Sequence, residues 1–151
     1  MNEYKINKNT LAIIPISKTE SKILELEKEF IIKKSVKNLI DESCIFFGSS
    51  YKGRLKGTKA LININYKSPI IIEESSEIIF FPTSSPRFEN CIWLSLENIK
   101  DYKKNKYNNS TIIFKNNRLL KLELSYYSLN NQILRSIKLN MVLKKRKLFQ
   151  K

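Results

Sequence analysis

The sequence predicts an α+β protein, with a mostly antiparallel sheet of short strands, one central helix and one C-terminal helix. Short apolar or alternating runs, separated by Gly, Pro, Asn and Ser, make up most of the chain and are typical of strands joined by turns. Two stretches instead place apolar residues at helical spacing. With 151 residues, of which 42% are hydrophobic, we expect residues 1–151 to form a single domain with one core.

The N-terminal part of the chain contains runs that predict strands. We expect strands at residues 4–6 and 11–16, on either side of a Lys8-Asn9 turn, and further strands at residues 22–26 and 30–33.

The first helical pattern begins after Ser35, which is a suitable N-cap, and ends before Gly48, which suits the position after a helix. The apolar residues at helical spacing are Val36, Leu39, Ile40, Cys44 and Phe47. We therefore expect a helix over residues 36–47. Residues 48–54 hold two of the three glycines and are predicted to be a loop, followed by a strand at residues 59–65.

The remaining strands are predicted at residues 70–72, 77–81 and 91–96, and a hairpin is predicted at residues 111–124. Its turn is Asn116-Asn117, because asparagine tolerates positive φ. Five aromatic residues in these apolar runs or at the end of the first helix are expected in the core: Phe46, Phe47, Phe80, Phe81 and Trp93.

The second helical pattern starts at Ser125 or Ser128. Its predicted buried stripe has residues four apart: Leu129, Ile133, Ile137 and Met141. We expect the chain from about residue 142 to be a basic tail in which the helix frays.

Positive charge dominates the composition, with 28 Lys and Arg against 14 Asp and Glu, a formal net charge of +14. Residues 43–72 carry five cations and no acid, and residues 124–151 carry seven cations and no acid. Such segments favour a polyanion as partner, nucleic acid first and a membrane surface second. The alternative is scattered solubilising lysine, since only 5 of the 28 cations are Arg and Asn and Ile are abundant, as in an A+T-rich genome.

Several classes of chemistry are excluded by missing residues. The sequence has no histidine, which removes Ser-His-Asp and Cys-His catalysis and imidazole metal ligands. Cys44 and Cys91 form no C-x-x-C motif, so we expect two buried thiols. We therefore expect no enzyme, no metal and no cofactor. The apolar runs are shorter than the ~18 residues that are needed to cross a bilayer, and the N-terminal run is too short for the apolar core of a secretory signal. We therefore expect a cytoplasmic protein.

Two common nucleotide- and DNA-binding motifs are not matched. Gly48 and Gly53 have the spacing of a P-loop, but Arg54-Leu55 stands where Lys and Ser or Thr are needed. A helix-turn-helix needs two adjacent short helices, and the patterns predict only one helix in this region. A sheet, loop or arm reaching the minor groove is then the expected mode of DNA reading. Residues with suitable side chains for it are Arg54, Arg87, Asn116, Asn117 and Arg118.

The candidate DNA contacts are cations of the two acid-free segments and of the hairpin. They are Lys52, Arg54, Lys56, Lys59, Arg118, Arg135, Lys138, Lys144, Lys145, Arg146 and Lys147. If they share a face they would neutralise several phosphates, and affinity would fall steeply with salt. Replacing Arg54 by Ala is expected to reduce the preference for A·T-rich sequence.

Five blocks of sequence resemble the bacterial competence transcription factor family, ComK. They stand in the family's order at residues 43–58 (SCIFFGSSYKGRLKGT), 67–71 (KSPII), 81–85 (FPTSS), 93–95 (WLS) and 125–132 (SYYSLNNQ). Together they cover roughly residues 35–140, whereas residues 1–34 match loosely. Better known members continue beyond the position equivalent to Lys151, so the resemblance is to a short or divergent member.

The resemblance implies a sequence-specific transcription activator without enzymatic activity. Members of the family bind A·T-rich boxes through the minor groove, as dimers or paired dimers, and switch on DNA-uptake genes. Their longer C-terminal region helps to deliver them to an adaptor-directed Clp protease. The partners implied are therefore A·T-rich double-stranded DNA, further copies of this chain and such a protease system.

Two other classes of function stay open at this point. One is a non-specific DNA-binding or RNA-binding module, which would keep the salt dependence and lose the base preference. The other is a protein-interaction or membrane-surface domain attracted to anionic lipid.

Overall fold

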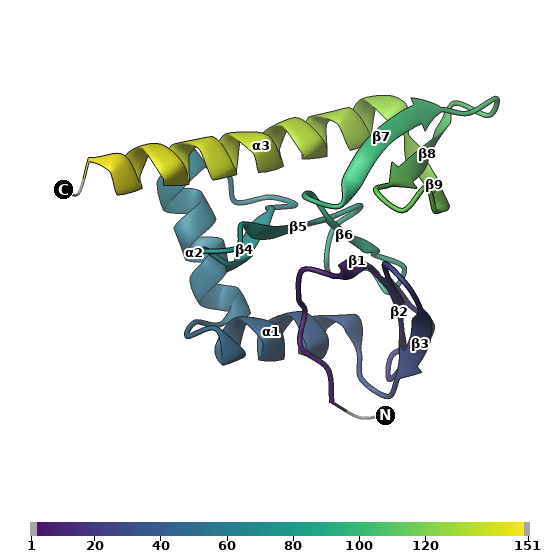
Figure 1. Cartoon of the computed structure of the whole chain (residues 1–151), viewed down its shortest axis with the longest axis horizontal. Helices are drawn as coiled ribbons and strands as arrows, with labels where there is room; N and C mark the ends of the chain where they lie inside the picture. The colour runs from purple at the N-terminus through teal and green to yellow at the C-terminus, as the bar shows by residue number, and fades with distance from the viewer. Residues whose placement is uncertain (1–2, 150–151) are drawn as a thin grey trace.

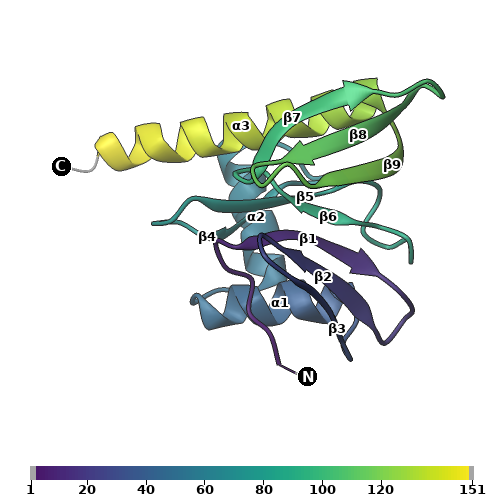
Figure 2. The same cartoon turned by 45° about the vertical axis from the view of Figure 1, so that its right-hand side comes forward.

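The computed structural model describes residues 3–149 and confirms the α+β class. A six-stranded antiparallel sheet lies at its centre, in the order β3-β2-β1-β6-β5-β4, and a three-stranded antiparallel sheet has the order β7-β8-β9 (Figure 2). The strands of the large sheet are β1 (Thr10–Pro15), β2 (Ser21–Glu25), β3 (Glu29–Ile32), β4 (Ile70–Glu73), β5 (Ile78–Pro82) and β6 (Trp93–Ser95). Those of the small sheet are β7 (Ile99–Lys104), β8 (Asn109–Phe114) and β9 (Leu119–Ser125).

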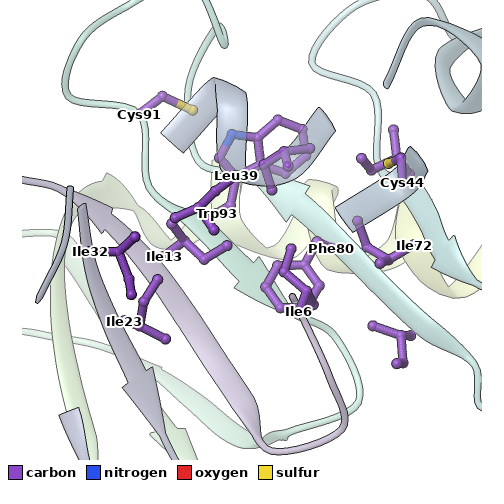
Figure 3. Packing of buried hydrophobic residues seen from close by; sticks show 13 residues of the cluster. Ile6, Ile13, Ile23, Ile32, Leu39, Cys44, Ile72, Phe80, Cys91 and Trp93 are labelled. Carbon is purple, nitrogen blue, oxygen red and sulfur yellow. The ribbon is translucent and has the colours of Figure 1, made fainter. Parts of the chain in front are cut away.

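The central strands of the six-stranded sheet are buried on both faces, because their successive side chains point to opposite sides of the sheet and are mostly apolar. One face carries Ile13, Ile23, Phe80 and Trp93, which pack with Leu39 and Cys44 of the first helix (Figure 3). The other face carries the neighbours Leu24, Phe81 and Leu94, which pack with the three-stranded sheet and the last helix. Strand β5 is accordingly buried at every position.

Three helices complete the fold: α1 (Val36–Phe46), α2 (Tyr51–Ile62) and α3 (Tyr126–Leu148). In Figure 1, α1 lies below the large sheet, α3 runs along the opposite side, and α2 rises between them at the β4 edge. Helix α1 confirms the predicted central helix. Its N-cap is Ser35, whose side chain accepts the Asn38 N–H, and Gly48 after it has φ +93°.

The prediction of a loop at residues 48–54 and a strand at residues 59–65 is wrong, because α2 occupies most of this region. Ser50 caps it by accepting the Gly53 N–H, and Asn63 ends it in the left-handed conformation with φ +57°. Tyr51, Leu55 and Ile62 face the core at helical spacing. The two glycines and the intervening lysines obscured this pattern.

Helix α3 confirms the predicted C-terminal helix, but its buried stripe differs from the predicted one. Ile137 and Met141 are exposed by 40% and 54%, whereas Ser136 and Leu139 are buried. A spacing of four residues drifts by about 40° per step around a helix with 3.6 residues per turn, so the contact face moves to other positions after Ile133. The segment from residue 142, expected to fray, is helical as far as Leu148.

Other expectations are corrected at single segments. Residues 4–6 form no strand, since Tyr4 and Ile6 are tied to the core by side-chain bonds: Tyr4 bonds Thr10 and Glu25, and the Ile6 N–H donates to Ser43. Strand β7 was not predicted. Phe46 is exposed by 63%, because it lies on the outer side of α1. The buried thiols Cys44 and Cys91 are confirmed, as are Phe80, Phe81 and Trp93 in the core.

Candidate nucleic-acid interface

Helices α1 and α2 are adjacent and are separated by only the four residues 47–50, so the prediction that no such helix pair exists is wrong. The short turn with a glycine is typical of helix-turn-helix pairs. The outward side of α2 carries Lys52, Lys56 and Lys59, which are exposed and lie at helical spacing on one stripe. We call these three residues the α2 lysine stripe.

Base edges in the major groove are read mostly by bidentate Arg, Asn or Gln side chains, and by Lys on guanine, near the N-terminus of a recognition helix. Between the lysines, α2 presents Gly53, Gly57 and Ala60. Lysine holds a phosphate as a point charge, and glycine and alanine carry no polar group. The composition of α2 therefore suits contact with the phosphate backbone more than reading of base edges.

The inward side of α2 covers the outer edge of strand β4. The Thr58 hydroxyl donates to the Pro69 carbonyl at 2.7 Å, and Arg54 Nη2 donates to the Ile72 carbonyl at 3.4 Å. Arg54 Nη1 lies 3.8 Å from a Glu74 carboxylate oxygen, and the side chain is only 16% exposed. Arg54 is thus largely buried against the edge of β4, on the side of α2 away from the lysine stripe.

The second half of α3 packs against the C-terminal end of α2. Leu139, Val142 and Leu143 contact Ile62 and its neighbours in one apolar cluster. At the surface above this cluster, Arg146 Nη2 donates to the Ala60 carbonyl at 3.4 Å. The two acid-free segments of the sequence therefore meet in the fold, as Figure 1 also shows for α2 and the C-terminal half of α3.

Two of the C-terminal cations are paired with acids of the β4–β5 turn. Lys144 lies 2.5 Å from Glu77, and Lys147 lies 3.5 Å from Glu74. The hydrogen bond from Lys144, with a further one from Asn140, lowers the pKa of Glu77. Lys145 and Arg146 are exposed, and no carboxylate within residues 3–149 lies within salt-bridge distance of either.

Arg135 and Lys138 lie about three and about two turns before Lys145 on α3, beside the loop that follows α2. Together with Lys67 of that loop they line a surface hollow of about 380 Å³, which we call the cationic hollow. No acid is among its lining residues. Lys67 was missed by sequence reasoning, although it belongs to the acid-free segment 43–72 and could have been found by that criterion.

Arg118 is not brought together with the other candidate contacts. It lies at the β8–β9 turn with its Nη2 2.7 Å from Glu29 of β3, which is at the opposite edge of the large sheet from β4 and α2. Hydrogen bonds from Lys22 and Arg118 lower the pKa of Glu29. Asn116 and Asn117 are also engaged, by the Leu26 carbonyl and by Lys100. Arg87 is exposed in the β5–β6 loop.

Two other kinds of site are absent from residues 3–149. Within this range the structure contains no group of three or more His, Cys, Asp or Glu residues arranged to hold a metal ion. No helix there has the length and hydropathy of a membrane span.

An α+β protein whose acid-free helices α2 and α3 join into one basic region is, as a class, a binder of polyanions. The chain belongs to the ComK family, whose model, described as "ComK protein", matches residues 1–148. This match includes residues 1–34, which sequence reasoning placed outside the clear resemblance. The competence transcription factor of Bacillus subtilis strain 168 is 34% identical over 139 residues, which cover 90% of this chain and 72% of that protein. No solved structure matches the chain.

Proposed function

We propose that this protein is a cytoplasmic transcription activator of competence genes that binds A·T-rich double-stranded DNA. Family membership and the name of the Bacillus subtilis relative support the class of function. The observation that carries the DNA-binding part is the junction of the two acid-free segments. These segments bring together eight cations that have no carboxylate partner within residues 3–149: Lys52, Lys56, Lys59, Lys67, Arg135, Lys138, Lys145 and Arg146. We call these eight residues the basic surface.

Within this proposal the basic surface holds the phosphate backbone. Each neutralised phosphate releases condensed counterions, which makes the affinity salt-dependent. Lys144 and Lys147 contribute less, because Glu77 and Glu74 already neutralise them. Arg54 and Arg118 are left out of the interface, since their guanidinium groups are engaged with Glu74 and Glu29.

The preference for A·T sequence is assigned to the minor groove. A·T tracts narrow this groove and strengthen its negative potential, which attracts an inserted arginine. Arg87 is the arginine with the most suitable placement, since it is exposed in a loop, where its guanidinium lies over the ring of its neighbour Phe88, at 5.7 Å. The family resemblance also supports binding in the minor groove.

The proposal includes binding by two or more copies of the chain. Four exposed apolar residues of α3 stand seven positions apart, which is a coiled-coil spacing and supports self-association: Tyr127, Leu134, Met141 and Leu148. Delivery to an adaptor-directed Clp protease, which the family resemblance implies, is also part of the proposal.

The proposed function is tested by fluorescence-anisotropy titration of two duplexes across a salt series. One duplex carries A- and T-tract half-sites about one helical turn apart, and the other has a G·C-rich scrambled sequence. We expect the A·T duplex to bind at least about tenfold more tightly at every salt concentration, with two or more copies bound. Equal binding that disappears with salt would instead identify the non-specific DNA- or RNA-binding module.

A further inference from the structure

We propose that the cationic hollow is a phosphate-binding pocket that receives one phosphate group of the bound DNA backbone. This inference depends on the proposed function, because it assigns one contact within the same interface. Lys67, Arg135 and Lys138 line the hollow, which has a volume of about 380 Å³ and no acidic lining residue.

Arg135 is held so that one edge of its guanidinium group stays free. Its Nη1 donates to the Tyr66 carbonyl and to the Gln132 side-chain oxygen, both at 3.0 Å. The hydrogen bonds that the Arg135 guanidinium group donates within residues 3–149 all use Nη1. Nη2 and Nε remain able to donate side by side, which is the geometry in which arginine binds two oxygens of a phosphate.

Gln132 holds the Arg135 guanidinium group in position through its side-chain oxygen. Its side chain is buried, with a residue exposure of 5%, and its Nε2 donates to the Lys67 carbonyl at 3.0 Å and to the Pro82 carbonyl at 2.7 Å. One buried amide therefore connects Arg135 on α3, Lys67 on the α2–β4 loop and the end of β5. Preorganised groups lose less freedom when they bind, so this network favours a specific contact over a diffuse one.

The backbone at Lys67 also departs from ordinary geometry. Lys67 has φ +46°, a left-handed conformation that is uncommon for a residue with a side chain. The bond from Gln132 to its carbonyl stabilises this conformation. Such positions cluster at binding sites, and here the conformation places the Lys67 carbonyl on Gln132 while its side chain lines the hollow.

The hollow adjoins the rest of the basic surface. The Tyr66 carbonyl that anchors Arg135 belongs to the loop directly after α2, and Ile64 of that loop packs in the α2–α3 cluster. A duplex strand that contacts the α2 lysine stripe thus has the hollow at the C-terminal end of the same helix. The structure assigns the hollow the role of an anchor that fixes the strand's position, since phosphate contacts set register.

The test is the slope of log affinity against log salt for binding to the A·T duplex. The double variant Arg135→Gln/Lys138→Gln is expected to lower the magnitude of the slope by about 0.9, the value for one phosphate. The matched control is Lys103→Gln/Lys104→Gln, which removes the same charge from exposed residues of β7 and should leave the slope unchanged. A decrease of the slope by about 1.8 would mean that the two cations contact two separate phosphates, and an unchanged slope would mean that they contact no phosphate. Either result overturns the single pocket.

A conservative variant tests the arginine fork. Arg135→Lys keeps the charge, so the slope should stay the same, but it removes paired donation and should weaken binding. Unchanged affinity would contradict the role of the fork.

Titration with inorganic phosphate, followed by the backbone amide NMR signals of Lys67 and Lys138, separates the two sources of phosphate. The duplex assignment is overturned if free phosphate fills the hollow while the double variant keeps the wild-type salt slope. If the wild-type chain binds no duplex at all, the proposed function itself fails, which is a different result.

Discussion

Arg54 resembles the other cations of residues 52–59 in sequence, yet its side chain lies on the opposite side of α2. It follows Lys52 by two positions, which is about 200° around a helix. Its guanidinium group contacts the Ile72 carbonyl and Glu74 at the edge of β4, and its Nε is buried with no hydrogen-bond partner among residues 3–149. Its position on the helix, more than its charge, therefore decides its role.

Replacing Arg54 by Ala is accordingly expected to lower stability and to leave DNA recognition unchanged. Loss of a largely buried, hydrogen-bonded cation, with Glu74 left unpaired, should lower the free energy of unfolding by roughly 1–3 kcal/mol. Urea denaturation measures this, and anisotropy titration measures the salt slope. Loss of A·T preference at unchanged stability would instead support the base-reading role that the sequence alone suggests.

Single-residue signals were predictable where the chemistry is local. The Ser35 cap and the positive φ of Gly48 and Asn117 follow from the residue types themselves. The role of Gln132 was not predictable. Its amide reaches the Lys67 carbonyl, 65 residues away in the chain, and no local pattern encodes that contact.

Helix α2 is the element at which the structure differs most from the sequence prediction. Its propensity is weakened by two glycines, and its lysines alternate with small residues in a way that resembles a strand or loop. Helical spacing of Tyr51, Leu55 and Ile62, with Ser50 as N-cap, could have identified it. Strand β7 was missed for a similar reason, because four of its six residues are exposed and it lacks clear alternation.

The two glycines of α2 provide a test of this helix. Gly57→Ala should raise the free energy of unfolding by about 0.4–1 kcal/mol, because no atom lies within 4 Å of its added Cβ and alanine restricts the unfolded chain. Gly53→Ala should give no such gain, since its Cβ would lie 2.7 Å from Ser49 Oγ and 3.2 Å from the capping Ser50 Oγ. Urea denaturation measures both variants. Equal increases in the free energy of unfolding would show that the N-terminus of α2 is not packed in this way.

At the scale of the whole molecule, the main feature is the meeting of residues 43–72 with residues 124–151. The sequence indicates that both segments lack acids, which is unusual for a face that only confers solubility. The sequence does not indicate that the two segments lie side by side, because their contact depends on α2 crossing the edge of β4 to reach α3. The same fold separates Arg118 from the other candidate DNA contacts, and it pairs Lys144 and Lys147 with acids of the β4–β5 turn.

We expect DNA to bind to this joined region, and removal of charge at matched positions decides whether it does. Lys52→Gln/Lys56→Gln/Lys59→Gln removes the α2 lysine stripe, and Lys100→Gln/Lys103→Gln/Lys104→Gln removes three exposed lysines from β7. In anisotropy titrations of the A·T duplex across a salt series, the first variant should lower the slope by up to about 0.9 per lysine, and the second should match the wild type. An equal decrease of the slope in both variants, or a decrease only in the second, would contradict DNA binding at the joined region.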